Sequence, residues 1–514
     1  MLTSVAQRDS RPSLLSSPSS PSFWPRVREF AVPGSMIETA TARRLAGDWA
    51  GACAAAGVDV DLRLRSVFRT HGRESADRIR ADLRRLAPDL LRWHLPRIAP
   101  NGLLRPGLTI ALARYDTPER DGPGGPLHLV VRTPPAWADA GQRVSLALWD
   151  GSHTEPGARR HPHPHPNRRF RLDLHRHLWD ATRADELRSR SGADRPAAAV
   201  GAVGAVGAVE PVGVDPRVLA ALPPGRPYAV DRWAEEAAIL LRAEGPGAGG
   251  AVSVRLGGRR RLLLDVIGGG GEGPNPAADA GPLSAAPHPR TSAVRVVVAE
   301  PGCGPGPAAV PPVLPDAATW ELPDLELIRT GAIDAEQLHP LVARALVPDG
   351  PTAGPGARKP WTRERAGQPR FVECRGDRHR IGLVDGVLSP LDHDPAEIRR
   401  EELLVALTGT PLPCLQAIDA AHRRPDCLAG VRERLDHGDI AGALAVVEGL
   451  LGPEAVLRGG PLRDELESAA QRRITYGLFR ADLLDPGPGS YLLDHGRPGD
   501  RRPGDRRPRP NTVR

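Results

Sequence analysis

Residues 108–115 read Leu-Thr-Ile-Ala-Leu-Ala-Arg-Tyr, residues 127–132 read Leu-His-Leu-Val-Val-Arg, and residues 144–149 read Val-Ser-Leu-Ala-Leu-Trp. In each segment apolar residues recur with a period of two, which is typical of β-strands, and Gly, Pro and Asp separate the segments. Residues 170–175 have the same pattern and predict a fourth strand. Most of the intervening segments are too short for a crossover helix, so we expect antiparallel pairing.

A helical region precedes these strands. Ile79, Leu83, Leu86 and Leu90 recur at intervals of four, three and four, which places them on one face of a helix. Pro88 interrupts this pattern and is expected to kink or end the helix, because proline lacks a backbone N–H.

The remaining patterns complete an α+β fold class. We expect antiparallel sheet blocks plus a helical C-terminal region, separated by Gly/Pro-rich disordered linkers. The further predicted elements are a helix over 231–243, strands over 252–256, 261–267 and 294–299, a hairpin over 370–384, and helices from 395 to about 484.

Glycine and proline each occur 56 times in 514 residues. The stretches where they cluster divide the chain into its expected parts. Residues 1–35 are expected to be a disordered extension, with Met36 as the natural start of the protein. The other expected parts are a helical segment followed by an antiparallel β block (36–188), a low-complexity linker (189–227), a small α+β block (228–300) with a disordered insertion (268–292), a Pro/Gly-rich region (301–369) with a short helical segment (324–347), a β-hairpin plus helical region (370–484) and a disordered Arg-rich tail (485–514).

The basic residues exclude several enzyme classes. Of 69 lysines and arginines only Lys359 is a lysine, and it lies in a Gly/Pro-rich stretch that no strand or helix can hold. P-loop NTPases, protein kinases, PLP enzymes and Schiff-base aldolases each need a placed lysine, so they are excluded. The net charge of +7 gathers at the two ends and in 159–169, and the arginine excess is typical of a GC-rich genome. We therefore do not expect a nucleic-acid partner.

Five cysteines occur without a Cys-x-x-Cys pair: Cys53, Cys303, Cys374, Cys414 and Cys427. Neither a disulfide framework nor a zinc framework is expected, and a reducing cytoplasm is the predicted compartment. No apolar stretch reaches the length of a membrane span, so no membrane association is expected.

Two short segments share residues in register. Gly47-Asp48-Trp-Ala-Gly51 and Gly438-Asp439-Ile-Ala-Gly442 both continue with alanines. The first glycine is expected to end one helix in the left-handed conformation, and the aspartate to cap the next helix. These segments resemble the hairpins of tetratricopeptide-type helical repeats, and this resemblance implies helical surfaces that bind proteins. An ordinary capped helical hairpin is the alternative, because no array of repeats follows.

The best candidate for chemistry is the triad Asp173, His175 and His177. On a strand these side chains project from one face, and two imidazoles with a carboxylate can bind a divalent metal such as zinc. The segment is similar to the His-x-His of metal-dependent amidohydrolases, which implies a metal-dependent hydrolase. Those enzymes need further ligands from later barrel strands, and an Ala/Gly/Pro-rich linker follows here instead, so a solvent-facing strand edge is the alternative reading.

A second histidine, His393, stands between Asp392 and Asp394 and suggests a phosphohydrolase of the HD type. The order Asp394-Pro395-Ala396-Glu397 is, however, a helix-start signature, which explains Asp394 without catalysis.

The sequence therefore favours a cytoplasmic, non-catalytic scaffold or protein-interaction component, with no cofactor and with a protein partner that the sequence does not identify. Its binding surface is expected in the helical region, where Leu462, Leu466, Ala469 and Ala470 share one helix face, although this stripe is equally typical of a core. The alternatives are the metal-dependent hydrolase and polyanion binding through the arginine tail at 497–509.

Overall fold

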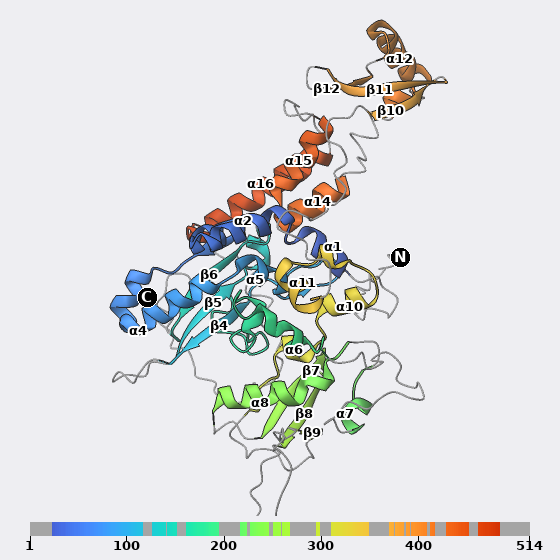
Figure 1. Cartoon of the computed structure of the whole chain (residues 1–514). Helices are drawn as coiled ribbons and strands as arrows, with labels where there is room; N and C mark the ends of the chain where they lie inside the picture. The colour runs from blue at the N-terminus through green and yellow to red at the C-terminus, as the bar shows by residue number, and fades with distance from the viewer. Residues whose placement is uncertain are drawn as a thin grey trace, which may run out of the picture.

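The computed structural model describes most of the chain between residues 23 and 483. The described residues are 23–116, 126–139, 141–151, 161–194, 216–223, 227–245, 250–258, 260–267, 295–298, 310–348, 370–374, 376–384, 387–390, 392–408, 412–416, 428–451 and 461–483. Of the linker expected at 189–227, residues 189–194 and 216–223 are described and residues 195–215 lie outside. The insertion at 268–292, residues 301–309 and 349–369 of the Pro/Gly-rich region, and the tail at 485–514 also lie outside the described residues. The described elements form an α+β fold (Figure 1).

The strands predicted at 108–115, 127–132 and 144–149 join a further short strand in one four-stranded sheet. Its order is β1-β6-β5-β4. Strands β4 (Thr109–Tyr115), β5 (Leu127–Arg132) and β6 (Val144–Trp149) pair antiparallel, which confirms the prediction. The short strand β1 (Val58–Val60) was not predicted, and it joins β6 in parallel with Val58 opposite Val144. Three residues are too few to produce a period-two pattern, so the sequence carries no signal for this strand.

Helices pack around this sheet and close its core. They are α2 (Gly34–Leu45), α3 (Trp49–Ala55), α4 (Leu64–Arg85) and α5 (Pro88–His94). Ile79 and Leu83 lie on α4, Leu86 follows its end and Leu90 lies on α5, and all four are buried in one core. Pro88 ends the first helix as predicted and then occupies the first turn of α5, where its missing N–H costs nothing.

Part of the extension that we expected to be disordered belongs to this core. Residues 24–30 form helix α1 (Trp24–Phe30), in which Val27 and Arg28 are buried. The Arg28 guanidinium donates to Asp324 at 2.7 Å and to the backbone oxygen of Trp93 at 2.7 Å. These partners are remote in sequence, so a local pattern cannot reveal them.

The expected helical segment at 324–347 also completes the N-terminal core and does not stand apart. It consists of α10 (Pro323–Arg329) and α11 (Pro340–Leu346), whose apolar residues pack with those of α4 and α5. The small elements of this body are β2 (Arg97–Ile98), β3 (Leu103–Leu104), α6 (Leu187–Ser191) and the 3₁₀ turns Ala136–Ala138, Arg176–Leu178, Ala184–Glu186 and Ala335–Gln337.

A second core lies below the first in Figure 1. Helix α8 (Trp233–Glu244) packs on the antiparallel sheet of β7 (Ala251–Gly257), β8 (Arg260–Ile267) and β9 (Arg295–Val298), as the sequence predicted. The other elements beside it are α7 (Pro216–Ala220), α9 (Asp316–Thr319) and the 3₁₀ turn Val230–Arg232.

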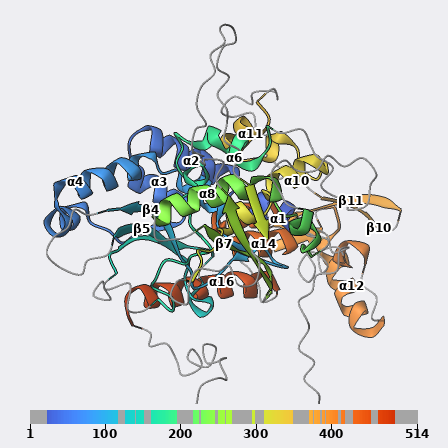
Figure 2. The same cartoon turned by 90° about the horizontal axis from the view of Figure 1, so that it is seen from below.

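The C-terminal part contains a small sheet and a set of helices. The predicted hairpin is formed by β10 (Arg370–Cys374) and β11 (Asp377–Val384), and β12 (Val387–Pro390) extends it. The predicted helices are α12 (Pro395–Thr408), α14 (Leu428–His437), α15 (Ile440–Leu451) and α16 (Pro461–Arg480). Figure 1 places the small sheet and α12 at the opposite end of the molecule from the second core, and Figure 2 shows α12 on the opposite side from α4. None of the helices described is long and apolar enough to cross a membrane.

Three of the four residues of the predicted stripe on α16 pack into a core, whereas Ala470 is exposed. Leu462 and Leu466 pack with the buried residues Val431, Leu435 and Ala469. Further along the helix, Tyr476 donates to Asp59 at 2.5 Å and Arg480 pairs with Asp61. These contacts hold α16 against the start of the N-terminal sheet.

Both predicted helical joints are confirmed. Gly47 and Gly438 have φ of +78° and +86°, and Asp48 and Asp439 accept hydrogen bonds from the amides of Gly51 and Gly442 at 2.8 and 2.9 Å. The two joints differ in their surroundings, because the Gly438 joint packs directly against the backbone of Gly141.

This difference gives a prediction. A β-carbon at Gly438 would lie 1.9 Å from the Gly141 oxygen, whereas one at Gly47 would meet nothing within 4 Å. We expect Gly47→Ala to lower the free energy of unfolding by about 1 kcal/mol through backbone strain alone. Gly438→Ala adds the clash and is expected to cost about 3 kcal/mol. Urea denaturation of both variants measures this, and equal losses would contradict the packing of the joint on Gly141.

Candidate metal centre

Three side chains from separate elements converge in the C-terminal module, which we define as the described residues of 370–416. Cys374 ends β10, His393 precedes α12, and Cys414 lies in a short helix at 413–416. One ligand atom of each residue lies within 4.8 Å of the other two. Among the residues that the structure describes, this is the one group of three or more such side chains that could hold a metal ion.

The His393 imidazole is oriented for metal binding. Its Nε2 atom is buried without a hydrogen-bond partner, and its Nδ1 atom lies 3.5 Å from Oε2 of Glu397, one helical turn away. A carboxylate beside the second ring nitrogen is the usual support of a metal-bound histidine. The His379 ring stacks on the His393 ring with centroids 4.1 Å apart and an interplanar angle of 11°. The ring is therefore held from two sides while Nε2 lacks a partner.

Both thiols are inaccessible to solvent, since Cys374 and Cys414 are each 0% exposed. Burial and the adjacent Cys374 thiol raise the pKa of Cys414 to about 11, so without a metal this thiol is neutral. A divalent cation stabilises thiolates. Two sulfurs with one imidazole nitrogen form a soft ligand set that fits zinc, and zinc would be held by Cys374 Sγ, Cys414 Sγ and His393 Nε2.

Sequence reasoning missed this group and excluded a zinc framework. The three residues are separated by 19 and 21 positions, and no short Cys-x-x-Cys spacing announces them. A weak signal existed, because a cysteine at the end of a predicted strand and a histidine at a predicted helix start are natural ligand positions. The capping role of Asp394 is confirmed by its bond from the Ala396 amide at 2.9 Å. Asp392 is engaged by Arg380 at 2.7 Å.

The predicted triad of Asp173, His175 and His177 lies elsewhere, between the first and second cores. Residues 170–175 do not form the predicted strand, because the segment turns and enters a 3₁₀ turn at Arg176–Leu178. Asp173 is paired with Arg171 at 2.7 Å. The alternation that placed the three side chains on one face is therefore absent.

The two histidines of that triad are buried and have different surroundings. His175 contacts the Arg171 oxygen at 3.0 Å through Nδ1 and lies 3.2 Å from Glu236 through Nε2. Burial alone would raise the pKa of Glu236, but hydrogen bonds from His175 and Arg190 lower it to about 2. Burial and the neighbouring His175 lower the pKa of His177 well below its usual value. The ionised Glu236 carboxylate of α8, in the second core, is therefore linked to His175, which lies beside the first core.

Comparison of the chain with protein-family models, curated proteins and solved structures gives no significant match. The metal centre therefore rests on its own geometry.

Proposed function

We propose that this protein is a non-catalytic scaffold that binds other proteins, and that its C-terminal module is folded around one structural zinc ion. The observation that carries the proposal is the convergence of two fully buried thiols with an unpartnered histidine nitrogen. Full burial of both thiols supports a structural ion, because catalytic zinc sites are open to substrate.

The size of the module supports a structural metal. Its apolar cluster consists of Cys374, Leu412 and Cys414, with Val372 and Leu415 packed against them. The module itself is short, and modules of this size commonly depend on a metal or a disulfide for stability. A zinc ion at the centre of this cluster supplies the missing stability.

The position of the module supports an interaction role. The small sheet and α12 stand apart from the N-terminal body, with α14–α16 between them (Figure 1). Leu403 on α12 is 71% exposed, and exposed large apolar side chains also occur on α15 and α16. Surfaces of this kind are suited to protein contacts. The described cysteines Cys53, Cys374 and Cys414 are free thiols, which favours a reducing cytoplasm as the compartment.

A metal-dependent hydrolase at the same centre is the second candidate. It is favoured by the count of ligands, because three protein ligands leave a fourth position that water occupies in catalytic zinc sites.

Cobalt substitution separates the two functions. We expect the purified protein to contain about one zinc ion per chain by elemental analysis, and the cobalt form to show a thiolate charge-transfer band. Added azide should leave that spectrum unchanged if the site is structural. A spectral change on azide addition would favour the hydrolase, and absence of stoichiometric metal would contradict both.

Affinity capture from the native host tests the scaffold role. We expect specific partners to co-purify with the zinc-loaded protein and to be lost or reduced when Leu403 is replaced by aspartate. If no protein co-purifies specifically under gentle conditions, the scaffold proposal fails.

A further inference from the structure

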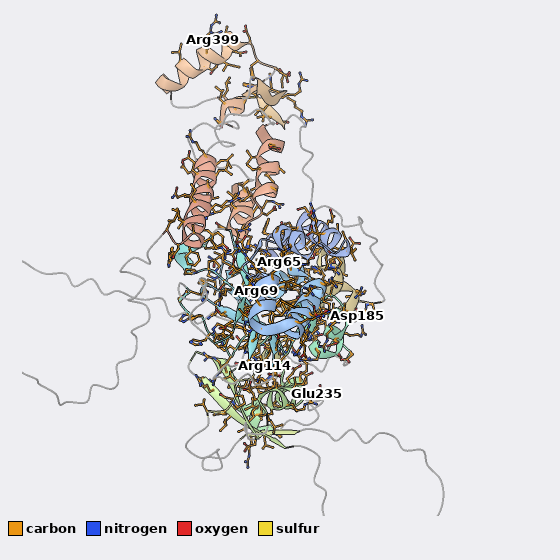
Figure 3. The ribbon with its side chains drawn as sticks, turned by 90° about the vertical axis from the view of Figure 1, so that its left-hand side faces the viewer. Arg65, Arg69, Arg114, Asp185, Glu235 and Arg399 are labelled. Carbon is orange, nitrogen blue, oxygen red and sulfur yellow. The ribbon has the colours of Figure 1, made fainter. Side chains whose placement is uncertain are left out.

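An arginine-lined pocket lies far from the metal centre, between the start of α3 and the start of α4. It measures about 430 Å³, and its lining includes Trp49, Leu62, Arg63, Leu64, Arg65 and Arg69. Figure 3 shows Arg65 and Arg69 on α4, on the face turned toward the viewer, with Arg399 of α12 at the far end of the molecule. We name this hollow the α4 pocket.

The charge of the α4 pocket is not balanced within the described part of the chain. Arg63, Arg65 and Arg69 are exposed, and no described carboxylate forms an ion pair with them. Elsewhere on α4 arginines are paired with a carboxylate, since Asp77 pairs with Arg73 at 3.6 Å and also with Arg80. Arg65 and Arg69 are one turn apart on the helix, an arrangement of like charges that weakens a helix.

Two acidic residues that precede the pocket in sequence are already engaged. Asp61 pairs with Arg480, and Asp48 accepts from the Gly51 amide while it pairs with Arg43 at 3.2 Å. The three pocket arginines are therefore available to carboxylates from outside the described chain, which the planar guanidinium group binds in a bidentate manner.

Apolar side chains accompany the arginines. Trp49 and Leu64 are half-buried at the pocket, and the adjacent Phe68 is 54% exposed. A ligand that satisfies both features carries negative charge together with an apolar side chain. A nucleic-acid backbone fits less well, because Glu74 and Asp77 are exposed just beyond the kink of α4 at Gly72 and repel phosphates there.

We propose that the α4 pocket binds an acidic peptide segment of a protein partner, with carboxylates on Arg63, Arg65 and Arg69 and an apolar side chain against Trp49 and Leu64. This binding site rests on the proposed function of the protein as a scaffold, and it specifies the chemistry of one partner. It does not depend on zinc, so metal content and peptide binding succeed or fail separately.

The test uses the full chain and a fluorescein-labelled peptide of glutamates and aspartates with a central pair of leucines, measured by fluorescence anisotropy. Replacing Arg65 and Arg69 together with glutamate is expected to weaken binding at least about tenfold. The matched control replaces Arg73 and Arg84 with glutamate, which alters the net charge equally outside the pocket, and is expected to change binding less than about twofold.

Folding is checked by thermal unfolding of the same samples, together with their zinc content. Both replaced side chains are exposed, so the pocket variant should unfold within a few degrees of the wild type. Equal losses in both double variants would overturn the proposal, as would failure of the wild type to bind the peptide. Tighter binding of a single-stranded RNA of equal charge that also depends on Arg65 and Arg69 would assign the pocket to nucleic acid.

Discussion

Replacement of Cys374 by alanine is expected to remove zinc from the protein and to unfold the C-terminal module while the N-terminal core stays folded. Cys374 is fully buried at the centre of the module, and a structural zinc ion contributes on the order of 10 kcal/mol to a module of this kind. Without this ligand, most of that contribution is lost. Hydrogen exchange by mass spectrometry should show lost protection over 370–416, and elemental analysis should show lost zinc.

Cys53 supplies the matched control, because it is also a fully buried free cysteine but lies in the N-terminal core. Burial raises its pKa to about 12, so its thiol is neutral and its role is packing. Cys53→Ala should retain one zinc ion per chain and normal protection of the module. If Cys374→Ala keeps stoichiometric zinc and unchanged hydrogen exchange, the metal centre is wrong.

The second large effect is expected from Arg92→Met. Arg92 is 1% exposed and donates to three backbone oxygens, those of Ala31 at 3.0 Å, Gln142 at 2.5 Å and His437 at 2.8 Å. Burial lowers its pKa to about 10, so the side chain is still charged at neutral pH. These bonds join the end of α1, the segment before β6 and the end of α14.

Methionine fills a similar volume but leaves three buried carbonyl groups without this donor. Each such loss costs about 1 to 3 kcal/mol, and hydrogen bonds from charged donors are the stronger ones. We expect the free energy of unfolding to fall by about 3 to 5 kcal/mol in urea denaturation, with early loss of hydrogen-exchange protection in α14 and α16. Arg65→Met, on the surface, should cost less than about 0.5 kcal/mol. A loss below about 1 kcal/mol for Arg92→Met would mean that the helices dock without this residue.

Local patterns were reliable where one face of an element is buried. The strands at 109–115, 127–132 and 144–149, the helix face through Ile79 and Leu83, and the two Gly-Asp joints all follow from interactions within a few residues. The same reasoning failed at 170–175, where apolar alternation occurs in a turning segment. Phe170 and Leu172 are buried there because they fill the core from a loop, without a strand ladder.

The candidate metal centre was beyond sequence reasoning for a related reason. Asp173, His175 and His177 are close in sequence, but the backbone turns between them, so Asp173 pairs with an arginine and His175 contacts Glu236. Cys374, His393 and Cys414 are remote in sequence, but a hairpin and two helix starts bring them together. Proximity along the chain was therefore a poor guide to proximity in space.

The sequence by itself determined the α+β class, the main strands and helices, and the capped joints. The tertiary structure decided that α1 and the 324–347 segment complete the N-terminal core, that β1 pairs in parallel, and that two thiols and an imidazole meet. The physical reason is the separation of the interacting residues along the chain. Periodicity and capping involve residues within a single turn or strand. Burial of Arg28 and Arg92 and convergence of the metal ligands depend on partners that only packing brings together.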